Sequence, residues 1–314
     1  MDQKLSLKQL HQNLIPLGLS YKLHFCQKKK VSEEKVTLLI QGRNESMELY
    51  NHIVPFFINE MKTDLFLFDL RGQGKSSGLP AHINSFEQYL NDLKIIVESL
   101  RALYKNIHIV SHSTGGLISS LFVGLWPEAI GKGGTVCLIS PFLGAYATGL
   151  QKFLLKKKLK AVRDTFEMLF QFFPKLELKR FVFSPTLNFK ENALTTNPYF
   201  YKTFDKHPSK CGPPTWGWLH QCFRAHLMAK TLAPKIKTPL FFALAGFDTV
   251  VDNKASWQFY LKGKWNQGPW VLKEFRGMKH ALFQAPDKTR NRLLKMIQSF
   301  QNDHKKFMNH HSIK

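Results

Sequence analysis

Short, continuously apolar runs alternate along the chain with longer amphipathic segments, and this alternation restricts the fold more than any other feature. Strands are predicted over residues 36–40, 65–70, 107–111, 135–140, 240–245 and 270–275. Helices are predicted over residues 45–62, 86–104, 114–126, 253–262 and 289–300. Strands covered on both faces are continuously apolar, and strands that alternate with helices form parallel sheets. The sequence therefore predicts an α/β fold with a mainly parallel, doubly wound sheet.

The alternation stops over residues 143–237. Apolar residues recur there at helical spacing, with lysines between them: Leu155, Leu159, Val162, Phe166, Leu169 and Phe173. Proline-containing pairs then predict a loop-rich stretch over residues 183–214. We interpret 143–237 as a helical cap inserted into a core formed by 1–142 and 238–301. Residues 20–26 predict an additional edge strand, and the polar residues 302–314 a disordered tail.

A candidate nucleophile follows the apolar run 107–111. Ser113 lies directly after this run, and Gly115 and Gly116 open the next predicted helix. A strand, a sharp turn and a helix are the setting of a nucleophile elbow, in which small residues flank the serine because the backbones approach closely. Ser111 stands two residues before Ser113, where glycine is usual. His112 diverges from Ser113 at such a turn, so we interpret it as a packed neighbour that helps to hold the turn.

A nucleophilic serine needs a histidine base, and the base needs an orienting carboxylate. Asp248 follows the run 240–245, and His280 follows the run 270–275. Both thus stand just past the carboxyl ends of predicted strands, where active sites of open α/β sheets collect. Asp252 competes with Asp248 for the acid role, but it also suits the cap of the helix that begins near Asn253. The order Ser113, Asp248, His280 favours a Ser-His-Asp triad.

Acyl transfer also requires two backbone N–H groups aimed at the developing oxyanion. One is expected from Thr114, the residue after the candidate nucleophile. The predicted strand 36–40 leads to Gly42, where the chain can turn sharply, so we assign the second donor to the N–H of Arg43. Without the three candidate side chains, Gly42 would indicate only an ordinary turn.

These segments together resemble the bacterial lysophospholipase and monoacylglycerol lipase branch of the α/β-hydrolases, and most of all the inner-membrane lysophospholipases of Gram-negative bacteria. The likeness rests on the segments QGRNE (41–45), DLRGQGKSSG (69–78), SHSTGG (111–116), DTVVD (248–252) and PPTWGW (213–218), and on His280. It implies an α/β-hydrolase fold, Ser113 as nucleophile, Asp248 as acid, His280 as base, and Arg43 and Thr114 as oxyanion donors. Ser111 replaces the usual glycine, and Gln41 the usual histidine.

The resemblance implies a lipid ester as substrate, with a lysophospholipid first and a monoacylglycerol or another carboxylic ester as alternatives. A peptidase similar to proline iminopeptidases shares the fold and triad, but the basic cap does not suit an N-terminal amine. A non-enzymatic basic binding protein is supported only by the formal net charge of +23. No basic–aromatic recognition motif is present, so no nucleic acid partner is expected. No cofactor and no metal are expected.

The chain is predicted to reside in the cytoplasm. Its four cysteines form no CxxC pair, and no apolar stretch reaches the roughly 18 residues needed to cross a bilayer. The excess of basic side chains attracts anionic surfaces, which allows peripheral contact with the inner membrane. Nothing in the sequence indicates an oligomeric state.

Overall fold

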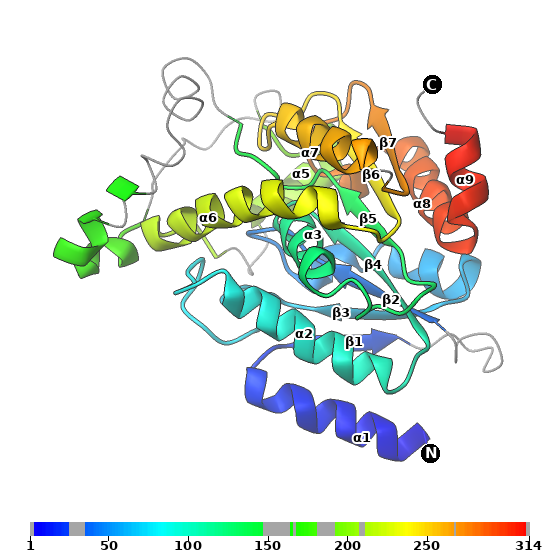
Figure 1. Ribbon diagram of the computed structural model, residues 1–314, viewed down its shortest axis with the longest axis horizontal. Coiled ribbons are helices and arrows are strands. Elements are labelled where there is room, and N and C mark those ends of the chain that lie inside the picture. The colour runs from blue at the N-terminus through cyan, green and yellow to red at the C-terminus, as the bar shows by residue number, and fades with distance from the viewer. Residues whose placement is uncertain are drawn as a thin grey trace.

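The computed structural model describes residues 3–24, 35–146, 164–165, 168–180, 192–206, 211–266 and 268–311. Its centre is a seven-stranded sheet in the order β1-β3-β2-β4-β5-β6-β7 (Figure 1). The strands are β1 (Tyr21–His24), β2 (Lys35–Ile40), β3 (Asp64–Phe68), β4 (Asn106–His112), β5 (Val136–Ile139), β6 (Leu240–Ala245) and β7 (Trp270–Phe275). Only β1 pairs antiparallel with its neighbour. The mainly parallel sheet is confirmed, and β1 is its predicted edge strand.

Helices cover both faces of the sheet because successive strand residues point to opposite sides. One face packs against α1 (Gln3–Leu14), α2 (Glu87–Arg101), α3 (Thr114–Leu125), α6 (Trp216–Leu232) and α7 (Asn253–Trp265). The other face packs against η2 (Met47–Tyr50), η3 (Phe56–Glu60), α8 (Asp287–Asn302) and α9 (His304–His311). Leu38 belongs to the first apolar core and Leu39 to the second. The sheet is therefore doubly wound, as predicted.

Residues 45–62 do not form the predicted α-helix. They contain the short helix η2 and the single π-turn η3, which begins after Pro55. Proline has no N–H to donate, and its ring clashes with the carbonyl group four residues earlier, so a continuous helix breaks there. Glu45 consequently lies outside any helix, and the residue is only 5% exposed.

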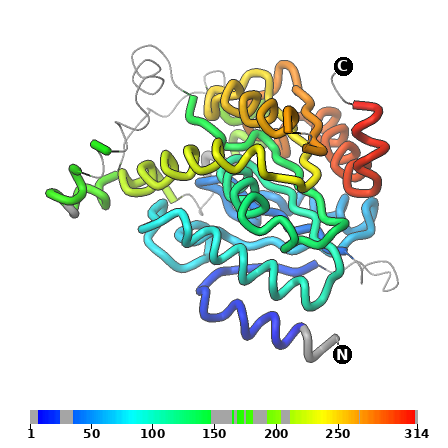
Figure 2. Tube along the Cα trace, in the orientation of Figure 1, coloured from blue at the N-terminus to red at the C-terminus, as the bar shows by residue number. Residues whose placement is uncertain are grey.

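The two ends of the chain add helices that the apolar pattern does not predict. Helix α1 lies beside α2 and buries Leu10 and Leu14 (Figure 2). The prediction of a disordered tail is wrong for α9, which packs against β7 and α8. Phe307 is 4% exposed, and its ring lies 5.3 Å from Phe241 and 5.5 Å from Phe300, centroid to centroid. One buried aromatic side chain anchors this otherwise polar helix.

The described residues between β5 and β6 form helices and no strand of the sheet. Besides α6 they contain η4 (Pro174–Leu178), α5 (Pro198–Lys206) and η5 (Ala233–Lys235), and η1 (Ile15–Leu17) and η6 (Leu282–Gln284) lie elsewhere in the core. Helix α5 occupies part of the predicted loop. The amphipathic helix predicted from Leu155 to Phe173 falls mostly outside the described residues, and its part from 168 to 172 is helical. The division into core and cap stays a prediction. No helix of the described segments is long and apolar enough to span a membrane.

Candidate active site

Ser113 occupies a sharp turn between β4 and α3. Its backbone has φ 51° and ψ −115°, a region that residues with side chains rarely adopt. Backbone hydrogen bonds hold the turn: the Ser113 carbonyl accepts from the N–H of Gly116 and of Phe142, both at 2.9 Å, and the Ser113 N–H donates to the carbonyl of Ile139 at 3.0 Å. The strand ends at His112 and the helix starts at Thr114, so one strained residue makes the whole reversal. This is the geometry of a nucleophile elbow.

The backbones around the turn approach as closely as the small residues suggest. A Cβ added to Gly115 would lie 2.5 Å from the carbonyl oxygen of Ile40. Ser111, which replaces the usual glycine, is completely buried, and its hydroxyl donates to the carbonyl of Cys137 at 3.3 Å. A serine therefore fits this position with its polar group satisfied.

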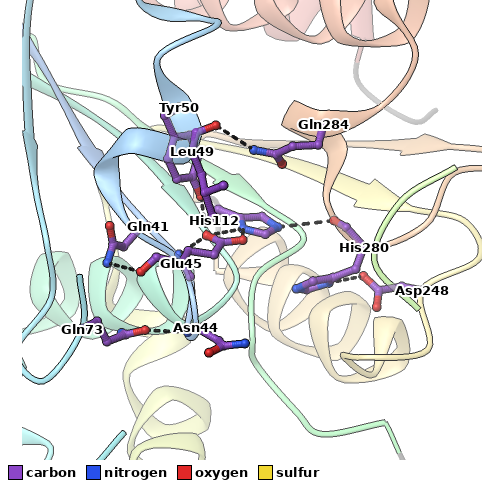
Figure 3. Close-up of polar contacts among 11 residues, drawn as sticks. Gln41, Asn44, Glu45, Leu49, Tyr50, Gln73, His112, Asp248, His280 and Gln284 are labelled. Atoms are coloured by element: carbon purple, nitrogen blue, oxygen red, sulfur yellow. Dashed lines mark hydrogen bonds and ion pairs between the residues drawn. The ribbon is translucent and has the colours of Figure 1, made fainter. Parts of the chain in front are cut away.

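His280 and Asp248 form a buried pair beside the turn (Figure 3). The imidazole Nδ1 lies 2.7 Å from Asp248 Oδ2, and the side chains are 4% and 0% exposed. Asp248 Oδ1 accepts from the N–H groups of Val250 at 2.9 Å and Val251 at 3.0 Å, which fixes the carboxylate. Asp252 instead caps α7 by accepting from the N–H of Lys254. Its interpretation as a helix cap is confirmed.

The His280–Asp248 pair lies close to the turn because the ring of His280 contacts the ring of His112, and His112 directly precedes Ser113. The rings of His112 and His280 are 4.8 Å apart, centroid to centroid. No hydrogen bond joins the Ser113 hydroxyl to His280 within the described part of the chain. Such bonds are often long before substrate binds and tighten in the reacting complex.

The loop after β2 packs directly against the turn. A Cβ added to Gly42 would lie 3.0 Å from the Cβ of Ser113. The N–H groups of Arg43 and Thr114 have no hydrogen-bond partner among the described residues, whereas Gly42 N–H is bound to Glu45 Oε2 at 2.7 Å. The Arg43 side chain points away, donating to the carbonyl of Gly212 at 2.9 Å. Both predicted oxyanion donors thus lack a protein acceptor, and their binding of an oxyanion stays a prediction.

A second buried pair, Glu45 with His112, stands behind this loop and was not predicted. Their closest atoms, Oε1 and Nδ1, are 3.0 Å apart, and the Tyr50 hydroxyl donates to Glu45 Oε2 at 2.5 Å (Figure 3). His112 Nε2 lies 3.4 Å from the carbonyl oxygen of His280. Glu45 therefore connects the candidate oxyanion loop to the backbone of the candidate base. Gln41 supports the same loop by donating to the carbonyl of Glu45 at 2.9 Å.

Burial and charge act in opposite directions on this pair. Burial raises the pKa of Glu45, but the charge of His112 and the hydrogen bonds from His112, Tyr50 and Gly42 outweigh it and leave that pKa below its ordinary value. Burial lowers the pKa of His112, and the adjacent Glu45 carboxylate overcomes this and raises it. The structure thus favours a carboxylate and an imidazolium held together out of water.

Comparison with known proteins assigns this fold and site to a class. Residues 32–287 match the model of the family described as serine aminopeptidase, S33, so the chain belongs to that family. The chain is a serine hydrolase with the α/β-hydrolase fold, which confirms the predicted fold and enzyme class.

Individual relatives show which branch of the family the chain resembles. The chain is 30% identical over 235 residues to a probable lysophospholipase L2 of Haemophilus influenzae, covering 70% of each protein. It is 25% identical over 250 residues to lysophospholipase L2 of Escherichia coli, covering 74% of this chain and 69% of that protein. A monoacylglycerol lipase of Paleococcus ferrophilus superposes with a TM-score of 0.72 at 21% identity, covering 91% of this chain and 99% of the lipase. The predicted likeness to the bacterial lysophospholipase branch is confirmed.

Proposed function

We propose that this enzyme hydrolyses carboxylic esters of lipids and that lysophospholipids are its principal substrates. The observation that carries the proposal is the buried Asp248–His280 pair, with Nδ1 and Oδ2 2.7 Å apart, beside a serine in a strained strand-to-helix turn. The similarity to two lysophospholipases supports the choice of substrate. Monoacylglycerol is the second candidate.

In the proposed reaction Ser113 Oγ attacks the acyl carbonyl while His280 takes its proton. Asp248 holds the ring through Nδ1 and stabilises the imidazolium, which then protonates the leaving alcohol. Water, activated by His280, releases the fatty acid from the acyl-enzyme in a second attack. The N–H groups of Arg43 and Thr114 would bind the oxyanion in both steps, because neither is engaged elsewhere in the described structure.

We also propose peripheral contact with an anionic membrane at its cytoplasmic face. Phe172 and Phe173, in the segment before η4, are 70% and 63% exposed. The exposed lysines Lys175, within η4, and Lys179, directly after it, follow in the sequence. Aromatic and basic side chains together suit a membrane interface, where each basic group near an anionic surface contributes about 1 kcal/mol.

The peptidase alternative suggested by the family's description requires a carboxylate for the substrate's amine. Two carboxylates, Glu45 and Asp248, contact the site residues described above. Each of them is already paired with a histidine. Neither is left to bind an ammonium group. Ester hydrolysis therefore suits the site better than removal of an N-terminal residue.

The experiment compares fatty-acid release from lysophosphatidylethanolamine and from monoacylglycerol, and aniline release from an amino-acid anilide, in the wild type and Ser113→Ala. We expect the lysophospholipid to give the highest kcat/KM and the alanine variant to lose all ester hydrolysis. A faster reaction with monoacylglycerol would reverse the order of substrates. Hydrolysis of the anilide alone would overturn the proposed ester specificity.

A further inference from the structure

The free edge of the sheet carries a cavity that does not belong to the site around Ser113. β7 is the last strand in the sheet, and none of the described segments pairs with its outer edge as a further strand. A cavity of about 680 Å³ lies along it, between α7, α8 and α9. Figure 1 shows β7 running between α7 and the α8–α9 pair. We call this cavity the edge groove, and its titratable lining residues are Lys273, Glu274, Arg276, Arg292, His310 and His311.

The charge of the edge groove is strongly one-sided, since Glu274 is the single carboxylate among these six residues. The basic residues come from three separate places, namely β7 and the loop after it, α8, and α9. Within the described residues, no ion pair engages Lys273, Arg276 or Arg292. An adjoining hollow shares Arg292 and His311 and adds two more lysines, Lys288 and Lys295.

The basic groups are close enough to act on one another. Burial lowers the pKa of His311, and the charges of Lys273, His310 and Arg292 lower it further. The Arg292 guanidinium lies over the ring of Phe275, 5.7 Å from its centroid, which holds it against the wall of the groove. Mutual repulsion of this kind is relieved when an anion binds between the cations.

Protection of an exposed strand edge accounts for only part of this arrangement. Charged residues, lysine above all, keep an edge strand from pairing with another chain, and Lys273 on β7 serves that purpose. Arg292, His310 and His311 stand on helices, where they block no strand pairing. Their convergence on one hollow needs a different explanation.

We propose that the edge groove binds a phosphate ester. Arginine side chains match the geometry of phosphate oxygens and lysine adds a point charge, so Arg276, Arg292 and Lys273 would hold the anionic group. The apolar lining, Trp257, Leu272 and Met278, offers a surface for the carbon skeleton of the ester. Phospholipid headgroups and soluble phosphate esters share this chemistry. The proposal does not rest on the function proposed for Ser113.

The test compares Lys273→Gln/Arg292→Gln with the control Lys132→Gln/Lys262→Gln, which removes the same charge at exposed positions outside the groove. Isothermal titration with phenyl phosphate should show equal binding by the wild type and the control. The groove variant should bind at least about tenfold more weakly, because a hydrogen bond to a charged group is worth about that factor. Arg276→Gln, at an exposed position, should also weaken binding without loss of packing.

Sedimentation with phosphatidylglycerol vesicles, against phosphatidylcholine vesicles, identifies the source of the phosphate. Weaker sedimentation of the groove variant indicates a lipid headgroup, and unchanged sedimentation together with weaker phenyl phosphate binding indicates a soluble ester. Equal phenyl phosphate affinity in the groove variant and the control overturns the proposal, as does the absence of saturable binding by the wild type. Fluorophosphonate labelling of Ser113 should be the same in all these variants, so failure of the groove proposal is separable from failure of the proposed function.

Discussion

Replacing Glu45 with glutamine removes the charge that holds the buried His112 imidazolium. The substitution keeps the size of the side chain and an oxygen that can accept from Gly42 N–H. It removes the counter-charge 3.0 Å from His112 Nδ1. His112 must then lose its proton or remain buried without a partner.

Breaking a buried ion pair by removing one partner costs about 3–5 kcal/mol. Because glutamine retains part of the hydrogen bonding, we expect the lower end, about 3 kcal/mol, or a Tm lowered by roughly 5–10 °C. Glu48→Gln is the matched control, since its ion pair with Lys75 is solvent-exposed, with side chains 31% and 69% accessible. An exposed pair contributes under about 1 kcal/mol.

The destabilisation should depend on pH in a way that an uncharged packing defect would not. The folded-state pKa of Glu45 is below its ordinary value of 4.5, so its contribution is present above that pH and is lost as the pH falls through the lowered pKa. The folded-state pKa of His112 is above its ordinary value of 6.5, so its contribution is present below that pH and is lost as the pH rises through the raised pKa. The difference in unfolding free energy between wild type and Glu45→Gln should therefore be largest between pH 4.5 and 6.5.

Urea denaturation of the wild type and both variants at a series of pH values measures this difference. We also expect kcat of Glu45→Gln to fall more than KM changes, because the loop that holds the oxyanion donors loses its ion pair with His112. A stability difference that is small, or constant from pH 4 to 9, would refute the ion pair. If kcat of Glu45→Gln equals that of Glu48→Gln, Glu45 does not position the oxyanion loop.

Four further substitutions test other parts of the structure. Asp248→Asn should lower kcat by about four orders of magnitude in ester hydrolysis assays, as loss of the orienting carboxylate does in other triads. Asp252→Asn should leave kcat and stability nearly unchanged, because asparagine caps a helix about as well as aspartate. Equal kcat values in the two variants would contradict Asp248 as the orienting carboxylate. Gly115→Ala should prevent stable folding or lower Tm sharply, since its Cβ would meet the Ile40 carbonyl oxygen at 2.5 Å; an unchanged Tm would contradict the close approach. Phe307→Ala should destabilise the protein by about 3–5 kcal/mol in urea denaturation, and a neutral result would mean that α9 does not pack on the core.

The sheet and the three candidate side chains were predictable because each depends on local sequence. A buried parallel strand is a continuous apolar run, and the carboxyl ends of such strands meet at one edge of the sheet. Ser113, Asp248 and His280 each follow such a run, so their proximity follows from the fold. Helix α9 escaped prediction because a single side chain, Phe307, buries it.

The Glu45–His112 pair could not be predicted, because it joins residues 67 positions apart through a contact between the loop after β2 and the end of β4. The sequence suggested that His112 helps to hold the turn, and nothing in the local pattern indicates its partner. Glu45 fell within a predicted helix, and the break at Pro55 releases the segment from that conformation. Such pairs become visible only when the tertiary arrangement of the loops is known.

Labelling with a fluorophosphonate probe, mapped by mass spectrometry, tests the central claim most directly. The probe reacts with a serine only where a base and an oxyanion site activate its hydroxyl. We expect one labelled residue, Ser113, with labelling abolished in Ser113→Ala and strongly slowed in His280→Ala. Labelling of a different serine, or full ester hydrolysis by Ser113→Ala, would contradict Ser113 as the nucleophile.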